Sequence, residues 1–216
     1  MPSGKVIDLT PQPTSAYLHI PFCRRRCFYC DFPISVVGDR RNGNNSPTIA
    51  HYVEVLCQEI QLTPGNTQPL ETIFFGGGTP SLLSVAQLEK ILQVLEQTFG
   101  IADSAEISME VDPGTFDRTQ VEGYRAAGVN RVSLGVQAFQ PELLQVCGRS
   151  HRVPDIYTAV DLLRQVGFSN LSLDLISGLP GQTLDDWHDS LTKAIALCPT
   201  HLSCYDLTVE PGTPFS

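Results

Sequence analysis

The stretch PFCRRRCFYCDF, residues 21–32, contains three of the seven cysteines in this chain of 216 residues. Their spacing is C-x3-C-x2-C, and they follow a short apolar segment, SAYLHI, at residues 15–20. Closely spaced thiols are typical of a metal site, but structural metal sites usually have four protein ligands. What takes the fourth position is therefore the question that decides both fold and function.

Three interpretations of these cysteines are open. Together with His19, they could hold a structural zinc ion. Cys27 and Cys30 alone match the C-x2-C spacing of a redox-active dithiol. The thiolates of Cys23, Cys27 and Cys30 could instead hold a [4Fe–4S] cluster and leave one iron open. An open iron can bind a small chelating molecule and pass it an electron, so the missing fourth cysteine would then be a functional feature.

The overall composition indicates a globular protein with an acidic surface. Hydrophobic residues make up 42% of the chain, and the formal net charge is −9. An acidic surface repels phosphates, so we expect no nucleic-acid partner. The sequence contains no secretory signal and no apolar run long enough to span a bilayer, so we expect a cytoplasmic protein without a transmembrane segment. In that reducing compartment, four isolated cysteines are expected to be small buried hydrophobes: Cys57, Cys147, Cys198 and Cys204.

Short apolar segments alternate with longer amphipathic segments along the chain. Strands are predicted at 15–20, 71–75, 105–111, 131–135, 170–175 and 201–207, and helices at 48–62, 85–99, 117–127, 154–166 and 184–197. This alternation predicts an α/β fold built from βαβ units, with a parallel sheet. The sheet could be open and doubly wound or curled into a partial barrel. In both cases, functional residues lie at the C-terminal ends of the strands.

The chain is predicted to consist of one core domain with a short arm. Residues 1–14 are polar and contain prolines, so we expect a flexible arm, and residues 15–216 form the core. The segment 35–47 is rich in glycine and asparagine and is predicted to be an exposed loop. The last predicted strand is followed only by TVEPGTPFS, so we expect that a longer protein continues beyond this point or has been cut here.

Polar residues stand at the ends of the predicted strands. GGGTP, at residues 76–80, follows the second strand, where glycines let the backbone approach a ligand closely or simply form a tight turn. Glu110 ends the third strand, where it could be a salt-bridge partner or a solvated strand end. Gln137 ends the fourth strand, where it could satisfy a loop backbone. Asp174 lies in the apolar run LSLDLI and is expected to be ion-paired or hydrogen-bonded, because an unpaired buried carboxylate is costly. Together these residues predict a ligand pocket.

The stretch YLHIPFCRRRCFYCDF resembles the cluster-binding loop of radical S-adenosylmethionine (SAM) proteins, and most of all that of oxygen-independent coproporphyrinogen III oxidases and their relatives. The resemblance continues through FFGGGTPSLL, SMEVDP, RVSLGVQAF, CGRSH, LDLISGLPGQT and YDLTVEPGTPF, and so runs from Tyr17 to Phe215. It implies a partial (β/α)6 barrel of the radical SAM type. It also implies a [4Fe–4S] cluster on Cys23, Cys27 and Cys30, with SAM bound beside it.

The same resemblance implies which residues contact SAM. Glu110 would meet the ammonium group of the methionine part, and Arg149 would hold its carboxylate, a task that suits a planar guanidinium. Gln137 and Asp174 would bind the ribose hydroxyls. The other positions implied at the methionine and adenosine ends are Tyr17, Tyr29, Gly77, Gly78, Thr79, Ile176 and Thr208.

One departure from the family pattern concerns function. The oxidases of this family have a further cysteine two positions after the third ligand, where this chain has Phe32. The heme-chaperone branch of the family lacks that cysteine and reads C-D-F. The resemblance therefore favours a protein that binds heme and passes it to an apo-hemoprotein, with the oxidase reaction, or another radical SAM reaction, as alternatives.

The heme site and the partners are less defined by the sequence. The resemblance places the heme-binding segment in a C-terminal domain that lies outside these 216 residues. A reductant protein would supply the cluster with electrons. The triplet Arg24, Arg25 and Arg26 could be an ordinary solvated loop, or it could offset the cluster's negative charge and help dock an acidic electron donor.

Overall fold

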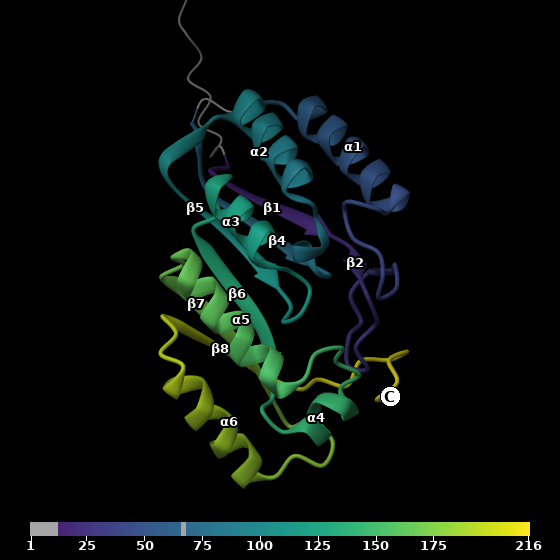
Figure 1. Ribbon diagram of the computed structural model, residues 1–216. Helices are drawn as coiled ribbons and strands as arrows, with labels where there is room; N and C mark the ends of the chain where they lie inside the picture. Colours follow the sequence, from purple (N-terminus) through teal and green to yellow (C-terminus); the bar gives the residue numbers. More distant parts are fainter. Residues whose placement is uncertain (1–12, 66–67) are drawn as a thin grey trace, which may run out of the picture.

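The computed structural model describes residues 13–65 and 68–216, and its main feature is a six-stranded parallel sheet. The strands are β1 (Ser15–Ile20), β4 (Leu70–Gly77), β5 (Ile101–Val111), β6 (Arg131–Gln137), β7 (Asn170–Ser177) and β8 (His201–Asp206). They lie side by side in the order in which they occur in the chain (Figure 1). A doubly wound sheet reverses its order at a switch point. The sequential order is instead that of a partial barrel, so the predicted α/β fold with six parallel strands is confirmed.

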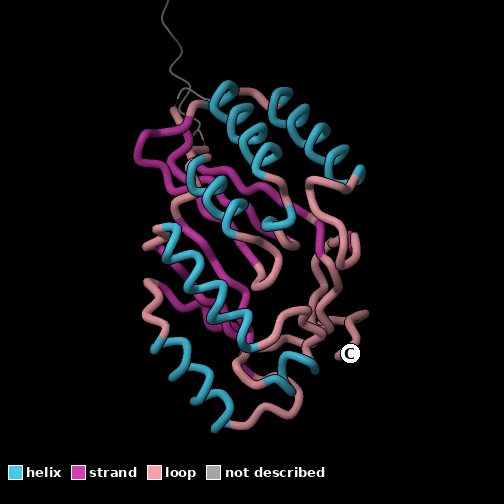
Figure 2. Tube along the Cα trace, viewed as in Figure 1, coloured by secondary structure: helices cyan, strands magenta, loops and turns pink. Residues whose placement is uncertain are grey.

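Helices connect the strands and lie together on one face of the sheet, as Figures 1 and 2 show. The longer ones are α1 (Pro47–Leu62), α2 (Val85–Phe99), α3 (Arg118–Ala126), α5 (Val153–Val166) and α6 (Leu184–Ala196). Parallel crossovers are right-handed, so a sheet that grows in one direction places every connecting helix on the same side. The helices therefore leave the C-terminal ends of the strands accessible to a ligand.

Helix α2 shows how local sequence sets these elements. Ser84 and Gln87 form a capping box that satisfies the first free backbone donors of the helix. Leu88, Ile91 and Leu95 are fully or almost fully buried, and the predicted apolar face of this helix is confirmed. Helices and sheet enclose a continuous apolar core between them.

Several short elements were not predicted from the sequence. They are β2 (Phe22–Cys23), β3 (Ser35–Val36), the 3-10 turn η1 (Pro80–Leu82) and α4 (Pro141–Val146). The pairing of β2 with β3 folds the cysteine stretch back on itself. The segment 35–47 is mostly exposed as predicted, but Ser46 is buried because its side chain caps the N-terminus of α1.

Two of the four isolated cysteines contradict the sequence prediction. Cys57 and Cys147 are buried as expected, whereas Cys198 and Cys204 are exposed. Cys204 lies in β8, which is the last strand of the sheet and is paired on one side only among the described residues, and Cys198 lies in the loop between α6 and β8. The predicted flexible arm lies outside the described residues except for its last two positions.

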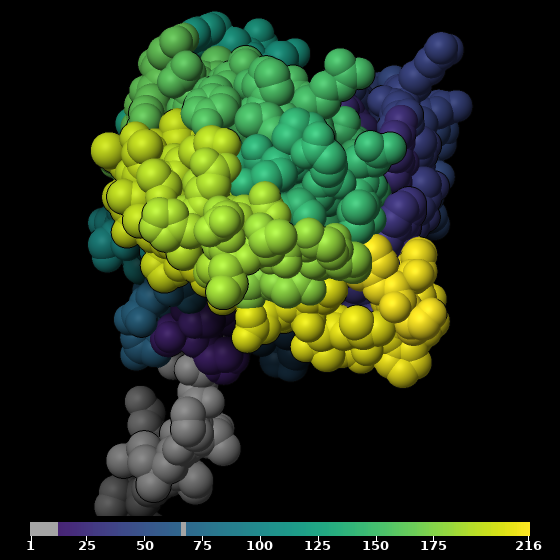
Figure 3. All heavy atoms as spheres, turned by 90° about the horizontal axis from the view of Figure 1, so that it is seen from below, coloured from purple at the N-terminus to yellow at the C-terminus, as the bar shows by residue number. Residues whose placement is uncertain are grey.

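The C-terminal segment returns to the cysteine stretch. The ring of Phe215 packs edge-on against Phe28, with 6.4 Å between centroids. Seen from below, the C-terminal surface and the N-terminal part of the chain lie next to each other (Figure 3). In the part of the chain that the structure describes, no helix is long and apolar enough to cross a membrane.

Candidate functional site

A cavity of about 350 Å³ lies at the C-terminal ends of the strands. Its walls come from the cysteine stretch, the turn after β4, the ends of β5, β6 and β7, and the segment after β8. The predicted site residues that line it are Cys23, Cys27, Tyr29, Cys30, Gly77, Gly78, Thr79, Glu110, Gln137, Arg149, Asp174, Ile176 and Thr208. Residues far apart in sequence thus meet in one pocket, although their individual roles remain predictions.

Tyr17 is the predicted site residue that does not line this cavity. Its side chain is 58% exposed, and its ring stacks on Phe74. Its hydroxyl lies 3.1 Å from Nδ1 of His19, while Nε2 of His19 lies 3.2 Å from the carbonyl of Pro33. Both ring nitrogens of His19 are therefore engaged, and this histidine does not complete a zinc site with the cysteines.

The three clustered cysteines are free thiols, and two of them face hydrogen-bond donors. Thr79 Oγ1 donates to Cys23 Sγ at 3.6 Å, and Arg149 Nη1 donates to Cys27 Sγ at 3.4 Å. Burial raises the pKa of the Cys23 thiol to about 12 and also raises that of Cys30. Metal binding reverses such a shift, because a coordinating thiol is deprotonated outright. The donors beside Cys23 and Cys27 suit thiolates, which are the ligands that iron–sulfur clusters take.

Among the described residues, no three His, Cys, Asp or Glu side chains are grouped closely enough to hold a single metal ion. A [4Fe–4S] cluster makes a different demand, because each thiolate binds its own iron. The three cysteines on one loop at the cavity wall fit the cluster interpretation in this respect.

The arginine triplet holds the cysteine stretch in shape. Arg24 donates to the carbonyl of Gly114 at 2.8 Å, and Arg25 forms a salt bridge with Asp39 at 2.7 Å. Arg26 donates to the carbonyls of Cys30 and Phe32. These contacts give all three arginines a role in the fold, beyond that of a solvated loop. The proposed docking of an electron donor stays a prediction.

Two of the carboxylates that line the cavity, Glu110 and Asp174, were predicted as site residues. Glu110 accepts a hydrogen bond from the backbone nitrogen of Gly77 at 3.0 Å. Burial, with smaller contributions from the charges of Asp174 and Asp112, raises the pKa of Glu110 to about 7. Asp174 accepts from Ser133 Oγ at 2.8 and 2.9 Å, so the prediction that this carboxylate is hydrogen-bonded is confirmed. Burial still raises its pKa.

Gln137 has an unusual backbone. Its φ of 68° lies in the left-handed region, and the register of β6 against β7 shifts at this point. A non-glycine residue in this region carries strain, which is often retained at ligand sites. The bulge ends the regular pairing of β6 beside the cavity.

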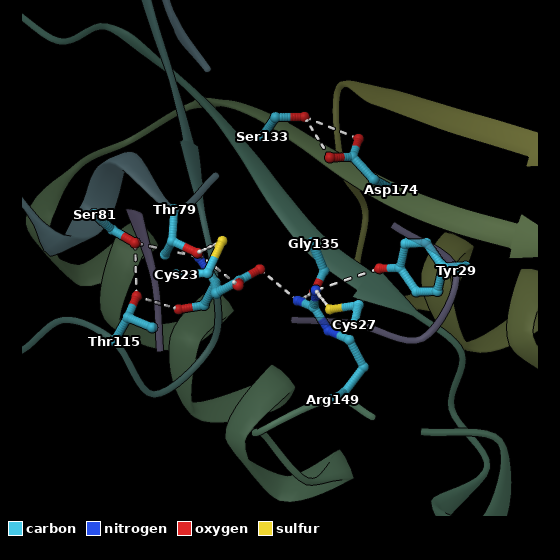
Figure 4. A network of polar contacts seen from close by, with 11 residues as sticks. Cys23, Cys27, Tyr29, Thr79, Ser81, Thr115, Ser133, Gly135, Arg149 and Asp174 are labelled. Carbon is cyan, nitrogen blue, oxygen red and sulfur yellow. Dashed lines mark hydrogen bonds and ion pairs between the residues drawn. The ribbon is translucent and has the colours of Figure 1, made fainter. Parts of the chain in front are cut away.

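The ion pair of the site involves a residue that the sequence analysis missed. Arg149 forms an ion pair with Asp112, and their side chains are 6% and 23% exposed. Arg149 Nη2 also donates to the carbonyl of Gly135 at 2.9 Å, and Nη1 lies 3.4 Å from Tyr29 Oη. Figure 4 shows Arg149 between Gly135, Cys27 and Tyr29. The motif SMEVDP contains Asp112, but nothing in it points to a partner 37 residues away.

The radical SAM superfamily profile matches residues 17–194. The chain belongs to the radical SAM superfamily. It is 57% identical over 203 residues to the heme chaperone HemW of Synechocystis sp.. The aligned region covers 94% of this chain and 49% of that protein. The HemW of Bacillus subtilis is 41% identical over 204 residues, or 52% of its length. The chain thus spans about half the length of the curated relatives it matches.

A second group of relatives carries a different name. The oxygen-independent coproporphyrinogen III oxidase of Bradyrhizobium diazoefficiens is 38% identical over 200 residues, 91% of this chain and 43% of that protein. Among solved structures, the coproporphyrinogen III oxidase HemN of Escherichia coli is 32% identical with a TM-score of 0.79, over 91% of this chain and 44% of that one. The methyltransferase TsrM from Kitasatospora setae is 20% identical with a TM-score of 0.62, and it shares the fold. The match covers 93% of this chain and 38% of the TsrM chain.

The family predicted from the sequence is therefore confirmed: the chain belongs with the coproporphyrinogen oxidase-like radical SAM proteins, in the branch of the HemW relatives. Membership of this superfamily implies a [4Fe–4S] cluster and SAM as cofactors.

Proposed function

We propose that this chain is the radical SAM core of a heme chaperone, a protein that binds heme and transfers it to apo-hemoproteins. The observation that carries the proposal is Phe32, which lines the cavity where the oxidases of the family have a cysteine. Its side chain is 53% exposed and offers neither a thiol nor a charge. The 57% identity to the HemW of Synechocystis sp. supports the same branch.

The cofactors are proposed to bind within the cavity. Cys23, Cys27 and Cys30 hold the cluster, which when bound supplies an electron to SAM and leaves one iron open for it. Thr79 and Arg149 stabilise the thiolates of Cys23 and Cys27 through the hydrogen bonds described above. Such bonds to sulfur help set the reduction potential of a cluster.

The remaining cavity residues are proposed to bind and orient SAM. Arg149 holds the methionine carboxylate, and Glu110 holds the ammonium group. Asp174, already fixed by Ser133, and Gln137 bind the ribose hydroxyls. Gly77 and Gly78 let the backbone approach the methionine end, with Thr79 next to them, and Tyr29, Ile176 and Thr208 flank the adenosine. Tyr17 acts at the rim, because its side chain lies outside the cavity lining.

The partners are proposals as well. The chain receives heme and passes it to an apo-hemoprotein, a reductant protein reduces the cluster, and the setting is the cytoplasm. The family resemblance implies that the segment that holds heme belongs to a C-terminal domain.

The oxidase function is the second candidate, and a specific observation favours it: HemN of Escherichia coli shares 32% identity and a TM-score of 0.79 with this chain. The two functions differ in their product. A coproporphyrinogen oxidase decarboxylates two propionate side chains of coproporphyrinogen III, whereas a chaperone returns heme unchanged.

The decisive experiment is anaerobic product analysis. The protein with a reconstituted cluster is incubated with coproporphyrinogen III, SAM and a strong reductant, beside the Escherichia coli oxidase as positive control. We expect no protoporphyrinogen IX from this protein and no gain when Phe32→Cys is introduced, because a reacting geometry within about 3–3.5 Å depends on the whole pocket. Turnover by the wild type would replace the chaperone proposal with the oxidase.

A further inference from the structure

Asp112 ties together three segments of the site. It follows β5 directly, and one carboxylate oxygen pairs with Arg149, while the other lies 3.3 Å from Thr79 Oγ1, whose single proton it shares with Cys23 Sγ. Its backbone is held too: its nitrogen donates to Ser81 Oγ at 3.3 Å, and its carbonyl accepts from Thr115 Oγ1 at 2.6 Å. Figure 4 shows Ser81, Thr79 and Thr115 together on this side of the site. The carboxylate is therefore fixed in position before any ligand arrives.

Arg149 depends on this carboxylate for its orientation. The two terminal nitrogens of its guanidinium have separate tasks: Nη2 is shared by Asp112 and the carbonyl of Gly135, and Nη1 faces Cys27 and Tyr29. A guanidinium is planar and rigid, so fixing Nη2 also fixes the direction of Nη1. The carboxylate also compensates the charge of a side chain that is almost fully buried.

Gly135 lets the ion pair lie directly on β6. A Cβ atom at this position would stand 2.7 Å from Asp112 Oδ1 and 3.1 Å from Arg149 Nη2. The first distance is shorter than any ordinary contact of a side-chain carbon, so an alanine here would push the two partners apart. The absence of a side chain at Gly135 therefore leaves the space that the Asp112–Arg149 ion pair occupies beside β6.

We propose that Asp112 is a positioning residue for Arg149. It holds Nη2 against β6 and so aims the rest of the guanidinium at Cys27 and at the cavity, where Arg149 is to meet the carboxylate of SAM. In this last respect the inference rests on the proposed function. In this role Asp112 acts on SAM binding through Arg149.

The test is a double-mutant cycle on the anaerobically reconstituted protein. Calorimetry measures SAM affinity for the wild type, Asp112→Asn, Arg149→Ala and the double variant. We expect Asp112→Asn to weaken binding about tenfold, equivalent to about 1.4 kcal/mol, and Arg149→Ala to weaken it at least as much. The double variant should bind like Arg149→Ala alone, because Asp112 has nothing left to position.

Two further variants separate positioning from general damage. Thr115→Val removes a bond to the backbone of Asp112 but keeps the carboxylate, so we expect near wild-type SAM affinity even if the melting temperature falls. Gly135→Ala keeps both charges but disturbs their geometry, so we expect it to reproduce the loss seen in Asp112→Asn. Iron content and the melting temperature are measured for every variant.

The outcomes distinguish this inference from the proposed function. Wild-type affinity in Asp112→Asn, additive losses in the double variant, or an equal loss in Thr115→Val would each overturn the positioning role while leaving the SAM site in place. Wild-type affinity in Arg149→Ala would remove Arg149 from the SAM site and overturn both.

Discussion

At the scale of single residues, Glu110 connects burial to ligand binding. Its pKa of about 7 means that it is largely protonated below neutral pH in the ligand-free protein. The proposed partner, the ammonium group of SAM, binds the ionised form. Asp174 and Asp112 raise this pKa through their charges, and the hydrogen bond from Gly77 lowers it, so the carboxylate can change its charge within the physiological range.

This gives a pH prediction with a defined sign. Below pH 7, SAM affinity should fall by up to about tenfold per pH unit, because binding must first remove a proton from Glu110. Calorimetry at several pH values from about 5.5 to about 7, below and at the pKa of Glu110, measures the SAM affinity. Repeating it in buffers of different ionisation enthalpy measures the proton released on binding. Glu110→Gln should bind roughly 1.5–3 kcal/mol more weakly and lose most of the pH dependence. An unchanged pH profile in that variant would assign the dependence to another group.

The cysteines give a second prediction at this scale. Reconstituted wild-type protein should hold about four irons per chain, and replacement of Cys23, Cys27 or Cys30 with alanine should abolish the cluster. Iron and sulfide counts with a visible absorption spectrum measure this. Cys198→Ser is the matched control, because this thiol is exposed and far from the cavity lining. A full cluster in all three alanine variants, or stoichiometric zinc in the native protein, would contradict the assignment.

At the scale of elements, the turn between β4 and η1 supports the cysteine stretch. The nitrogen of Gly78 donates to Ile20 at 2.9 Å, and that of Thr79 donates to Phe22 at 2.7 Å. A Cβ on Gly78 would lie 2.8 Å from both carbonyl oxygens that precede Cys23, those of Ile20 and Phe22. These contacts are with rigid backbone, so the turn and the strand leading to the first cysteine cannot both stay in place if the glycine is changed.

Gly78→Ala is therefore expected to destabilise the apo-protein by about 1–3 kcal/mol and to lower iron incorporation. Denaturant unfolding and iron counts measure the two effects. Ser84→Ala, which removes the cap of α2, is expected to cost about 1 kcal/mol while leaving iron incorporation unchanged. Equal iron loss in both variants would mean that overall stability, and not the turn geometry, limits cluster assembly.

The elements also show what a sequence can and cannot predict. The long strands and helices were predicted well, because apolar periodicity is strong over a dozen residues, as at Leu88 and Ile91 in α2. Helix α4 has six residues and offers no such period. Asp112 was missed for a different reason: before a proline it resembles a turn residue, and its partner is brought near only by the tertiary fold. Cys204 was misjudged because an edge strand and an inner strand have similar sequences.

At the scale of the whole molecule, the sequential sheet explains why one cavity collects so many functional residues. Every strand contributes its C-terminal end to the same side, and every helix covers the other face. The cysteine stretch and the segment after β8 complete the walls. The fold thus lines one cavity with groups from five of the six strands, β4 to β8, which suits SAM and the cluster but leaves little of the cavity for a second large ligand.

This arrangement predicts that heme and SAM do not compete. The cavity of about 350 Å³ is lined by the residues proposed for SAM and the cluster, and pockets of roughly 300–1,000 Å³ typically enclose one ligand of moderate size. Saturating heme should therefore leave the SAM dissociation constant of this chain unchanged. Absorbance titration follows heme binding, and calorimetry follows SAM binding. Arg149→Ala serves as the control and should weaken SAM binding without changing heme binding. Stoichiometric displacement of SAM by heme would place the heme site in the cavity itself and contradict the separation of the two ligands.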